Sequence, residues 1–105
     1  MRKTEGLDIE REFNRACRYY QSGDSRGAEA ICRKILSVSP DDPNALNLLG
    51  LIAHQSGENE TATMLISRAI RNNPEDPFLF NNLGAVLHDS DKFSEAITSY
   101  KRAIQ

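Results

Sequence analysis

The chain has 105 residues, of which 39% are hydrophobic and 27% charged, and its net charge is −2. This composition is typical of one small folded domain and excludes a disordered chain. The near-balanced charge argues against a nucleic-acid-binding surface, and the apolar runs are far too short to span a membrane. The first ten residues contain no apolar run typical of a signal peptide. We therefore expect a cytoplasmic domain that binds neither nucleic acid nor membranes.

Apolar residues recur at the spacing of amphipathic helices in three successive pairs of segments. In the first pair the apolar positions are Ile9, Ala16 and Tyr19, then Ala28, Ile31 and Ile35. In the second pair they are Leu46, Leu49 and Ala53, then Ala62, Leu65, Ile66, Ala69 and Ile70. In the third pair they are Leu83 and Leu87, then Phe93, Ala96, Ile97, Tyr100 and Ala103. No segment shows the alternation of a β-strand, so the fold class predicted is all-α.

Helix boundaries follow from the prolines and turn residues. Pro43 and Pro77 are predicted to open the first helices of the second and third pairs, where a missing N–H costs nothing. Turns are predicted at Gly23, at Gly57 and at Ser90-Asp91. The acidic residues before Pro43 and Pro77 are interpreted as stabilising the next helix N-terminus rather than as calcium ligands.

The three pairs repeat with a period of 34 residues. Leu49-Gly50 is followed 34 residues later by Leu83-Gly84, and several further positions keep the same step. Among them are Ala28, Ala62 and Ala96, then Cys32, Ile66 and Tyr100, then Gly23, Gly57 and Asp91. Because residues match at several registers with the same period, the sequence predicts a three-unit array. The units are expected at about 9–42, 43–76 and 77–105, after a lead-in of residues 1–8.

Gly50 and Gly84 lie within predicted helices, where glycine costs about 1 kcal/mol relative to alanine. Such a cost is expected where another helix comes too close for a Cβ atom. We expect Ala62 and Ala96 to be the matching small residues on the second helix of each unit.

This helix–turn–helix pattern resembles the tetratricopeptide repeat (TPR) family. The resemblance rests on Leu-Gly in the first helix and on an alanine, a large residue and a second alanine in the second, followed by proline. It runs from about Ile9 to the end of the chain, although Ala53 and Leu87 replace the tyrosine of the family. It implies a single domain, a right-handed α-solenoid of three units, with a concave groove lined by the first helix of each unit.

The family's groove positions, transferred residue by residue, define the candidate peptide-binding residues. In the first unit they are Phe13, Asn14, Cys17 and Tyr20, and in the second Asn47, Leu48, Leu51 and His54. In the third they are Phe78, Asn81, Asn82, Ala85 and His88. Gln21, Gln55 and Asp89 extend the same surface, which is rich in amides and apolar groups and not basic.

The resemblance also separates two kinds of ligand. Chaperone-binding members hold a C-terminal carboxylate with lysine, arginine and asparagine, but here Phe13, Phe78 and Asn82 occupy those positions. Asn82 is instead similar to the groove asparagines of TPR arrays attached to O-linked N-acetylglucosamine transferases. Asparagine offers both a donor and an acceptor to a peptide backbone. We therefore expect an extended protein segment as ligand.

Other patterns have simpler interpretations than a chemical site. His54 and His88 share a register, but neighbouring first helices lie roughly 10 Å apart, too far for one metal ion. Cys32 is expected in the core and Cys17 at the groove. The basic residues of the first unit are interpreted as solvated faces or as contacts to an acidic partner. No nucleophile–base pair or phosphate loop can be assembled, so neither enzymatic activity nor a cofactor is expected.

The last helix is expected to expose part of an apolar face, at Ile97, Tyr100 and Ile104. This predicts either a longer repeat protein or a cover from another chain, most simply a homodimer through the terminal helices. The function predicted is a non-catalytic protein-interaction module with a peptide or protein ligand. The alternatives are a self-associating scaffold and the substrate-recruiting arm of a larger enzyme such as a glycosyltransferase.

Overall fold

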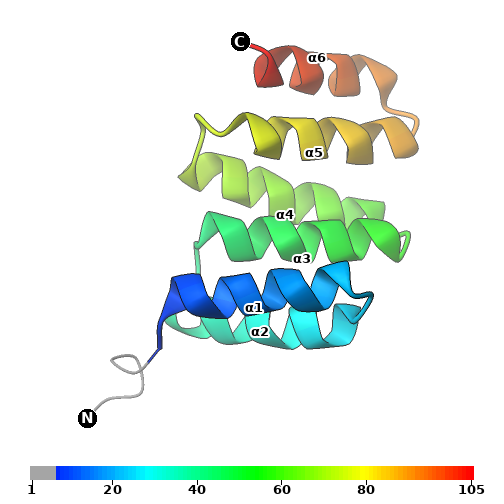
Figure 1. The fold of residues 1–105 in the computed structure, drawn as a ribbon. Coiled ribbons are helices and arrows are strands. Elements are labelled where there is room, and N and C mark those ends of the chain that lie inside the picture. The colour runs from blue at the N-terminus through cyan, green and yellow to red at the C-terminus, as the bar shows by residue number, and fades with distance from the viewer. Residues whose placement is uncertain (1–6) are drawn as a thin grey trace.

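The computed structural model describes residues 7–105, and these residues form an all-α solenoid of three helical pairs (Figure 1). The helices are α1 (Ile9–Gln21), α2 (Ser25–Val38), α3 (Pro43–Gln55), α4 (Asn59–Asn72), α5 (Pro77–Asp89) and α6 (Phe93–Ala103). The stack is elongated, with extents of 50 × 27 × 19 Å. None of these helices is both long and apolar enough to cross a bilayer. The all-α prediction is confirmed; most of the predicted lead-in, residues 1–6, lies outside the described residues.

Aspartates cap four of the helix N-termini. The carboxylates of Asp8, Asp24, Asp42 and Asp76 each accept a hydrogen bond from a backbone N–H in the first turn of α1, α2, α3 and α5. Each bond satisfies a donor that has no partner within the helix and places negative charge at the positive end of the helix dipole. The acidic residues before Pro43 and Pro77 therefore serve the following helices, as predicted.

The turn inside each unit requires one residue with a positive φ. Gly23 and Gly57 adopt φ of 90° and 80°, and Asp91 adopts 62° at the same register. Glycine enters this region without a steric penalty, whereas a residue with a Cβ atom does not. The third turn keeps the backbone of the other two and therefore carries strain that they lack.

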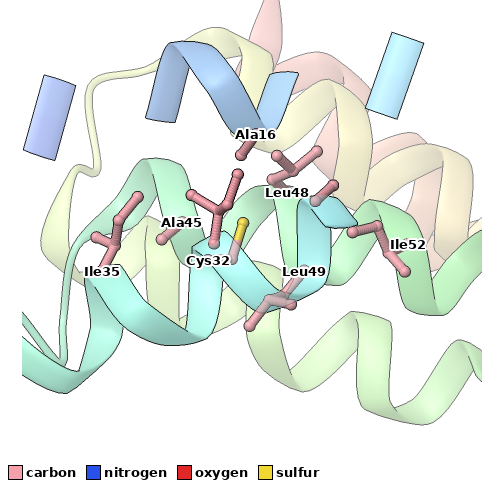
Figure 2. Close-up of a cluster of buried hydrophobic side chains, with 9 residues drawn as sticks. Ala16, Cys32, Ile35, Ala45, Leu48, Leu49 and Ile52 are labelled. Carbon is pink, nitrogen blue, oxygen red and sulfur yellow. The ribbon is translucent and has the colours of Figure 1, made fainter. Parts of the chain in front are cut away.

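The main core lies where the first unit meets the second. Ala16 of α1, Cys32 and Ile35 of α2, and Ala45 and Leu49 of α3 all belong to one buried cluster (Figure 2). Smaller clusters join α3 and α4 to α5, through Ala62, Ile66 and Val86 and through Leu46, Ala69 and Leu79. The three units thus share one continuous apolar interior, as stacked repeats do.

Within each unit the two helices meet at one register with little room. A Cβ atom added to Gly50 would lie 2.6 Å from Ile66 Cγ1, and one added to Gly84 would lie 2.7 Å from the Tyr100 ring. The predicted close approach is confirmed. Ala62, the small residue predicted opposite Gly50, has its carbonyl oxygen 3.4 Å from this point, and the side chains of Ile66 and Tyr100 lie nearest to the two glycines. A small residue on the first helix makes room for a large one on the second.

Substitution of alanine for Gly50 and for Gly84 is expected to change the free energy of unfolding differently. Ile66 is fully buried, so Gly50→Ala should lower the free energy of unfolding by about 1 kcal/mol, overpacking outweighing the gain in helix propensity. Tyr100 is 37% exposed and its ring can move outward, so Gly84→Ala should be neutral or stabilising. Urea denaturation of both variants measures the difference; a Gly50→Ala protein at least as stable as Gly84→Ala would contradict this packing.

The strained turn gives a second prediction. Asp91→Gly should stabilise the chain by about 0.5–1 kcal/mol, because glycine occupies positive φ without strain. The matched control is Gly57→Asp, which moves the same strain to the second unit and should destabilise the chain by a similar amount. Thermal unfolding of the pair provides the measurement, and equal effects of the same sign would disprove the argument.

Candidate functional site

All thirteen candidate residues come from α1, α3 and α5. These first helices of the three units contact one another in turn, α1 with α3 and α3 with α5, and so provide one continuous surface. We call it the first-helix face. It is made of two seams, one where α1 meets α3 and one where α3 meets α5, and the two seams differ in chemistry.

The candidate residues differ in exposure. The exposed ones are Asn14, Phe78, Asn81 and His88, and among them Phe78 is 74% exposed. The half-buried ones are Phe13, Cys17, Tyr20, Asn47, Leu51, His54, Asn82 and Ala85. Half-buried side chains between helices keep one side free for a ligand while the other is fixed by packing.

Leu48 corrects the sequence-based prediction. Its side chain is only 3% exposed and belongs to the buried cluster with Ala16, Cys32 and Ala45 (Figure 2). Because an apolar side chain at this register gains more from the core than from the surface, Leu48 fills the seam between α1 and α3. It therefore supports the first-helix face from beneath and is not available to a ligand.

The seam between α1 and α3 is apolar. Phe13, Cys17 and Tyr20 pack against the same buried cluster that contains Leu48. Burial raises the pKa of the Cys17 thiol and of the Tyr20 hydroxyl above their usual ranges. Burial also raises the pKa of Cys32 to about 12, so this thiol stays protonated and unreactive at neutral pH. This seam therefore offers apolar and aromatic surface and no reactive nucleophile.

The seam between α3 and α5 is polar. Asn82 Nδ2 donates a hydrogen bond of 3.1 Å to Asn47 Oδ1, and His54 Nε2 lies 2.6 Å from Asp89 Oδ2. Both contacts join residues 35 positions apart and lie two turns from each other along α3 and α5. The Asn82–Asn47 bond uses one donor and one acceptor, and each amide has further hydrogen-bonding capacity for a ligand.

Asp89 links the two histidines. Besides His54, the carboxylate lies 3.5 Å from His88 through its other oxygen. Hydrogen bonds from His54 and then His88 lower the pKa of Asp89 below its usual range, so this carboxylate is ionised at neutral pH. The sequence predicted the histidines as a groove pair but missed this bridge. The 35-residue step between His54 and Asp89 was the signal that could have revealed it.

Two surface hollows lie outside the first-helix face. One of about 780 Å³ lies between the turns that precede α4 and α6, and its wall includes Glu58, Asn59 and Lys92. The other, of about 480 Å³, lies between α2 and α4 and has Ile52 and Met64 among its lining residues. None of the predicted site residues lines either hollow, so a ligand of the first-helix face would bind to an open surface and not in a closed pocket.

The Asp89 bridge gives a prediction for pH. Because the folded pKa of Asp89 is lowered, its bonds contribute stability above the ordinary pKa of about 3.9 and lose it as the pH falls through the folded pKa. Wild type should therefore exceed Asp89→Asn in urea midpoint at about pH 6, and the difference should shrink as the pH is lowered below the ordinary carboxyl pKa and through the lower folded pKa. The same difference at both pH values would show that the bridge has no linkage to stability.

The solenoid closely matches solved structures. An O-GlcNAc transferase variant from Thermobaculum terrenum superposes with a TM-score of 0.92 at 32% identity, over 99% of this chain and 20% of the transferase. PilF of Pseudomonas aeruginosa matches with a TM-score of 0.88 at 22% identity, over 92% of this chain and 44% of PilF. MamA matches with a TM-score of 0.81 at 16% identity, over 92% of this chain and 57% of MamA. The last two likenesses show the fold alone.

Sequence comparison identifies the family. Two models of the tetratricopeptide repeat match the chain, one over residues 13–77 and one over residues 79–105. Comparison with curated proteins finds no match. Because the first match alone spans more than half of the 105 residues, the chain belongs to the tetratricopeptide repeat family.

Proposed function

We propose that this chain is a non-catalytic interaction module that binds an extended segment of another protein along the first-helix face. Tetratricopeptide repeats generally mediate protein–protein interactions. The observation that carries the proposal is the polar seam between α3 and α5, with its half-buried bond from Asn82 to Asn47 and its exposed contact between His54 and Asp89.

A polar seam is not what packing alone favours. The equivalent seam between α1 and α3 is filled by Leu48, which is 3% exposed, with Phe13 and Tyr20 packed against the same cluster. Polar groups lose solvation when they are partly buried, and their mutual hydrogen bonds only recover that loss. The repeat can thus stack with an apolar seam, and the half-buried asparagines are better explained by recognition of a ligand.

The two seams suggest the chemistry of the ligand. Asn47 and Asn82 can donate to carbonyls and accept from amides of an extended backbone, which gives affinity with little sequence preference. Phe78 is 74% exposed at the start of α5, one turn before Asn82, and offers an aromatic surface to an apolar side chain. The ionised Asp89, with a side chain 55% exposed, repels acidic residues at that end of the seam. We infer an uncharged or basic segment.

Two further roles are favoured by particular observations. The match of 99% of this chain to one fifth of an O-GlcNAc transferase suggests a module that brings protein substrates to a catalytic region. In that role the first-helix face would bind the substrate segment, so the same residues would be used. The apolar residues exposed on α6 suggest instead a part in assembly.

A peptide selection tests the binding proposal. A random peptide library displayed on phage is selected on the immobilised wild-type chain, and the affinities of the selected synthetic peptides are measured by calorimetry. Phe78→Ala combined with Asn82→Ala should weaken binding by about tenfold or more, because it removes an anchor and a backbone partner.

The matched control is Met64→Ala, which removes an apolar side chain that is 55% exposed on α4, outside the first-helix face. It should leave the affinity unchanged. If Met64→Ala weakens binding and the double variant does not, the peptides bind between α2 and α4 and the proposal fails.

A further inference from the structure

A row of positive charge lies along one side of α1, in the unit at one end of the stack (Figure 1). Arg11, Arg15 and Arg18 are spaced by four and three residues, which places them on one side of the helix. Arg11 and Arg18 are exposed, and the side chain of Arg15 is 40% exposed. We call these three residues the arginine row.

In the other two units the same positions are apolar and packed. They hold Ala45, Leu49 and Ile52 in α3, and Leu79, Leu83 and Val86 in α5. The three in α3 are at most 7% exposed, and they share one buried cluster with Ile31 and Ile35 of α2. The repeat thus builds this side of a first helix as a surface on which a neighbouring helix packs.

The arginines change which kind of helix can pack there. An apolar helix, such as a further repeat of this kind would place before α1, would bury guanidinium groups without a compensating charge, which is strongly unfavourable. Contact with water alone does not explain the row either. Like charges four residues apart repel one another and destabilise a helix, whereas a mixture of both signs would solvate this side without that repulsion. An acidic neighbour would remove both effects.

The carboxylates of the chain itself only partly neutralise the row. Arg15 Nη1 lies 2.9 Å from Glu12 Oε1, but the same oxygen lies 3.7 Å from Lys34 Nζ, so two cations share one carboxylate. Residues 1–6 lie outside the described residues, and their sequence contains two basic residues and one acidic residue. The lead-in therefore adds positive charge, and the complement of the row has to come from another molecule.

A third surface hollow, of about 260 Å³, lies beside the arginine row. Its lining residues are Arg15, Arg18, Tyr19 and Ser22. Tyr19 is 39% exposed, and its ring lies against α2, because a Cβ atom added to Gly27 would be 3.2 Å from Tyr19 Cδ1. Guanidinium groups bind carboxylates through paired hydrogen bonds, and a tyrosine hydroxyl can donate one more. The hollow thus suits a carboxylate side chain.

We propose that the arginine row is a second interaction surface, which binds an acidic helix of another protein. The helix packs on α1 as α2 packs on α3, with its glutamate or aspartate side chains opposite Arg11, Arg15 and Arg18. One of these carboxylates enters the hollow beside Tyr19. None of the candidate residues of the first-helix face belongs to the row, so this surface goes beyond the proposed peptide binding and does not depend on it.

The row is too short to track a nucleic acid. From Arg11 to Arg18 the helix rises by about 10 Å. Carboxylates stand at both ends, because Asp8 caps α1 before Arg11 and Asp24 caps α2 after Tyr19. A continuous chain of phosphates would meet these carboxylates, whereas two turns of an acidic helix fit between them. An acidic protein segment is therefore favoured over a polyphosphate.

A designed helix tests the proposal. The probe is a stapled, alanine-rich peptide with three glutamates along one side at spacings of three and four residues, and its binding to the full chain is followed by fluorescence anisotropy at low salt. Wild type should bind the probe. A chain with Arg11→Glu, Arg15→Glu and Arg18→Glu combined should bind it about tenfold more weakly or worse, because attraction becomes repulsion.

The matched control reverses three other charges. Arg71→Glu, Lys92→Glu and Lys101→Glu combined make the same change of net charge at exposed positions on α4, before α6 and on α6. This control should keep most of the wild-type affinity. Equal losses in the two variants would show attraction to the net charge of the chain alone, and would overturn the proposal.

A charge exchange tests direct contact and also shows that the reversed chain is folded. The same stapled peptide with lysines in place of the glutamates should bind the chain with the reversed row and not wild type. The proposal fails if wild type does not bind the glutamate peptide, or if the reversed chain, with a wild-type circular dichroism spectrum, does not bind the lysine peptide. It also fails if a peptide of the same composition with its glutamates spread around the helix, or a ten-nucleotide single-stranded DNA, binds wild type equally well.

The two interaction surfaces can be tested separately. Phe78→Ala combined with Asn82→Ala should bind the glutamate peptide as wild type does, because both residues lie on α5. The chain with the reversed row should in turn keep its affinity for uncharged peptides selected on the first-helix face. Loss of one activity with retention of the other identifies which of the two proposals is wrong.

Discussion

Within each unit the first helix approaches the second at one register, and the sizes of the two residues there set how closely the helices pack. Gly50 faces the fully buried Ile66, and Gly84 faces the Tyr100 ring. The first unit has Ala16 and Cys32 at the same positions, so a larger residue on one helix goes with a smaller one on the other. A small residue on the first helix thus recurs at this register in every unit, and it leaves room for the second helix in spite of different sequences. Similar pairs stack regularly, and regular stacking brings α1, α3 and α5 together as one face.

That regular backbone allows neighbouring seams to differ in chemistry. The seam between α1 and α3 is closed by Leu48 and half-buried aromatics, whereas the seam between α3 and α5 holds amides and the Asp89 bridge. The same separation applies to the ends of the array. Arginines take the places on α1 that apolar residues occupy on α3, while apolar residues are exposed on α6. The side chains at equivalent positions determine the chemistry of each surface, while the three units share one fold.

Much of the fold could be predicted because it rests on local chemistry and on a period. The turns follow from Gly23 and Gly57, and the period extends that prediction to Asp91, whose φ is 62°. The candidate surface was predicted less well, because helical spacing shows which side of a helix a residue occupies but not what the neighbouring helix places there. Leu48 was predicted at the surface because it occupies a groove position of the family, yet it is buried between α1 and α3. The Asp89 bridge joins His54 to a residue 35 positions later. A comparison of residues at the 34-residue period pairs His54 with His88 and therefore does not reveal it.

The central claim is that the polar seam between α3 and α5 recognises the backbone of an extended segment. The most direct test follows the side-chain amide signals of the asparagines by NMR while a selected peptide is added to the wild-type chain. The amides of Asn47 and Asn82 should shift with saturation, while that of Asn72, which donates to the Arg68 carbonyl on α4, should stay in place. Shifts at Asn72 with unchanged signals from Asn47 and Asn82 would contradict it.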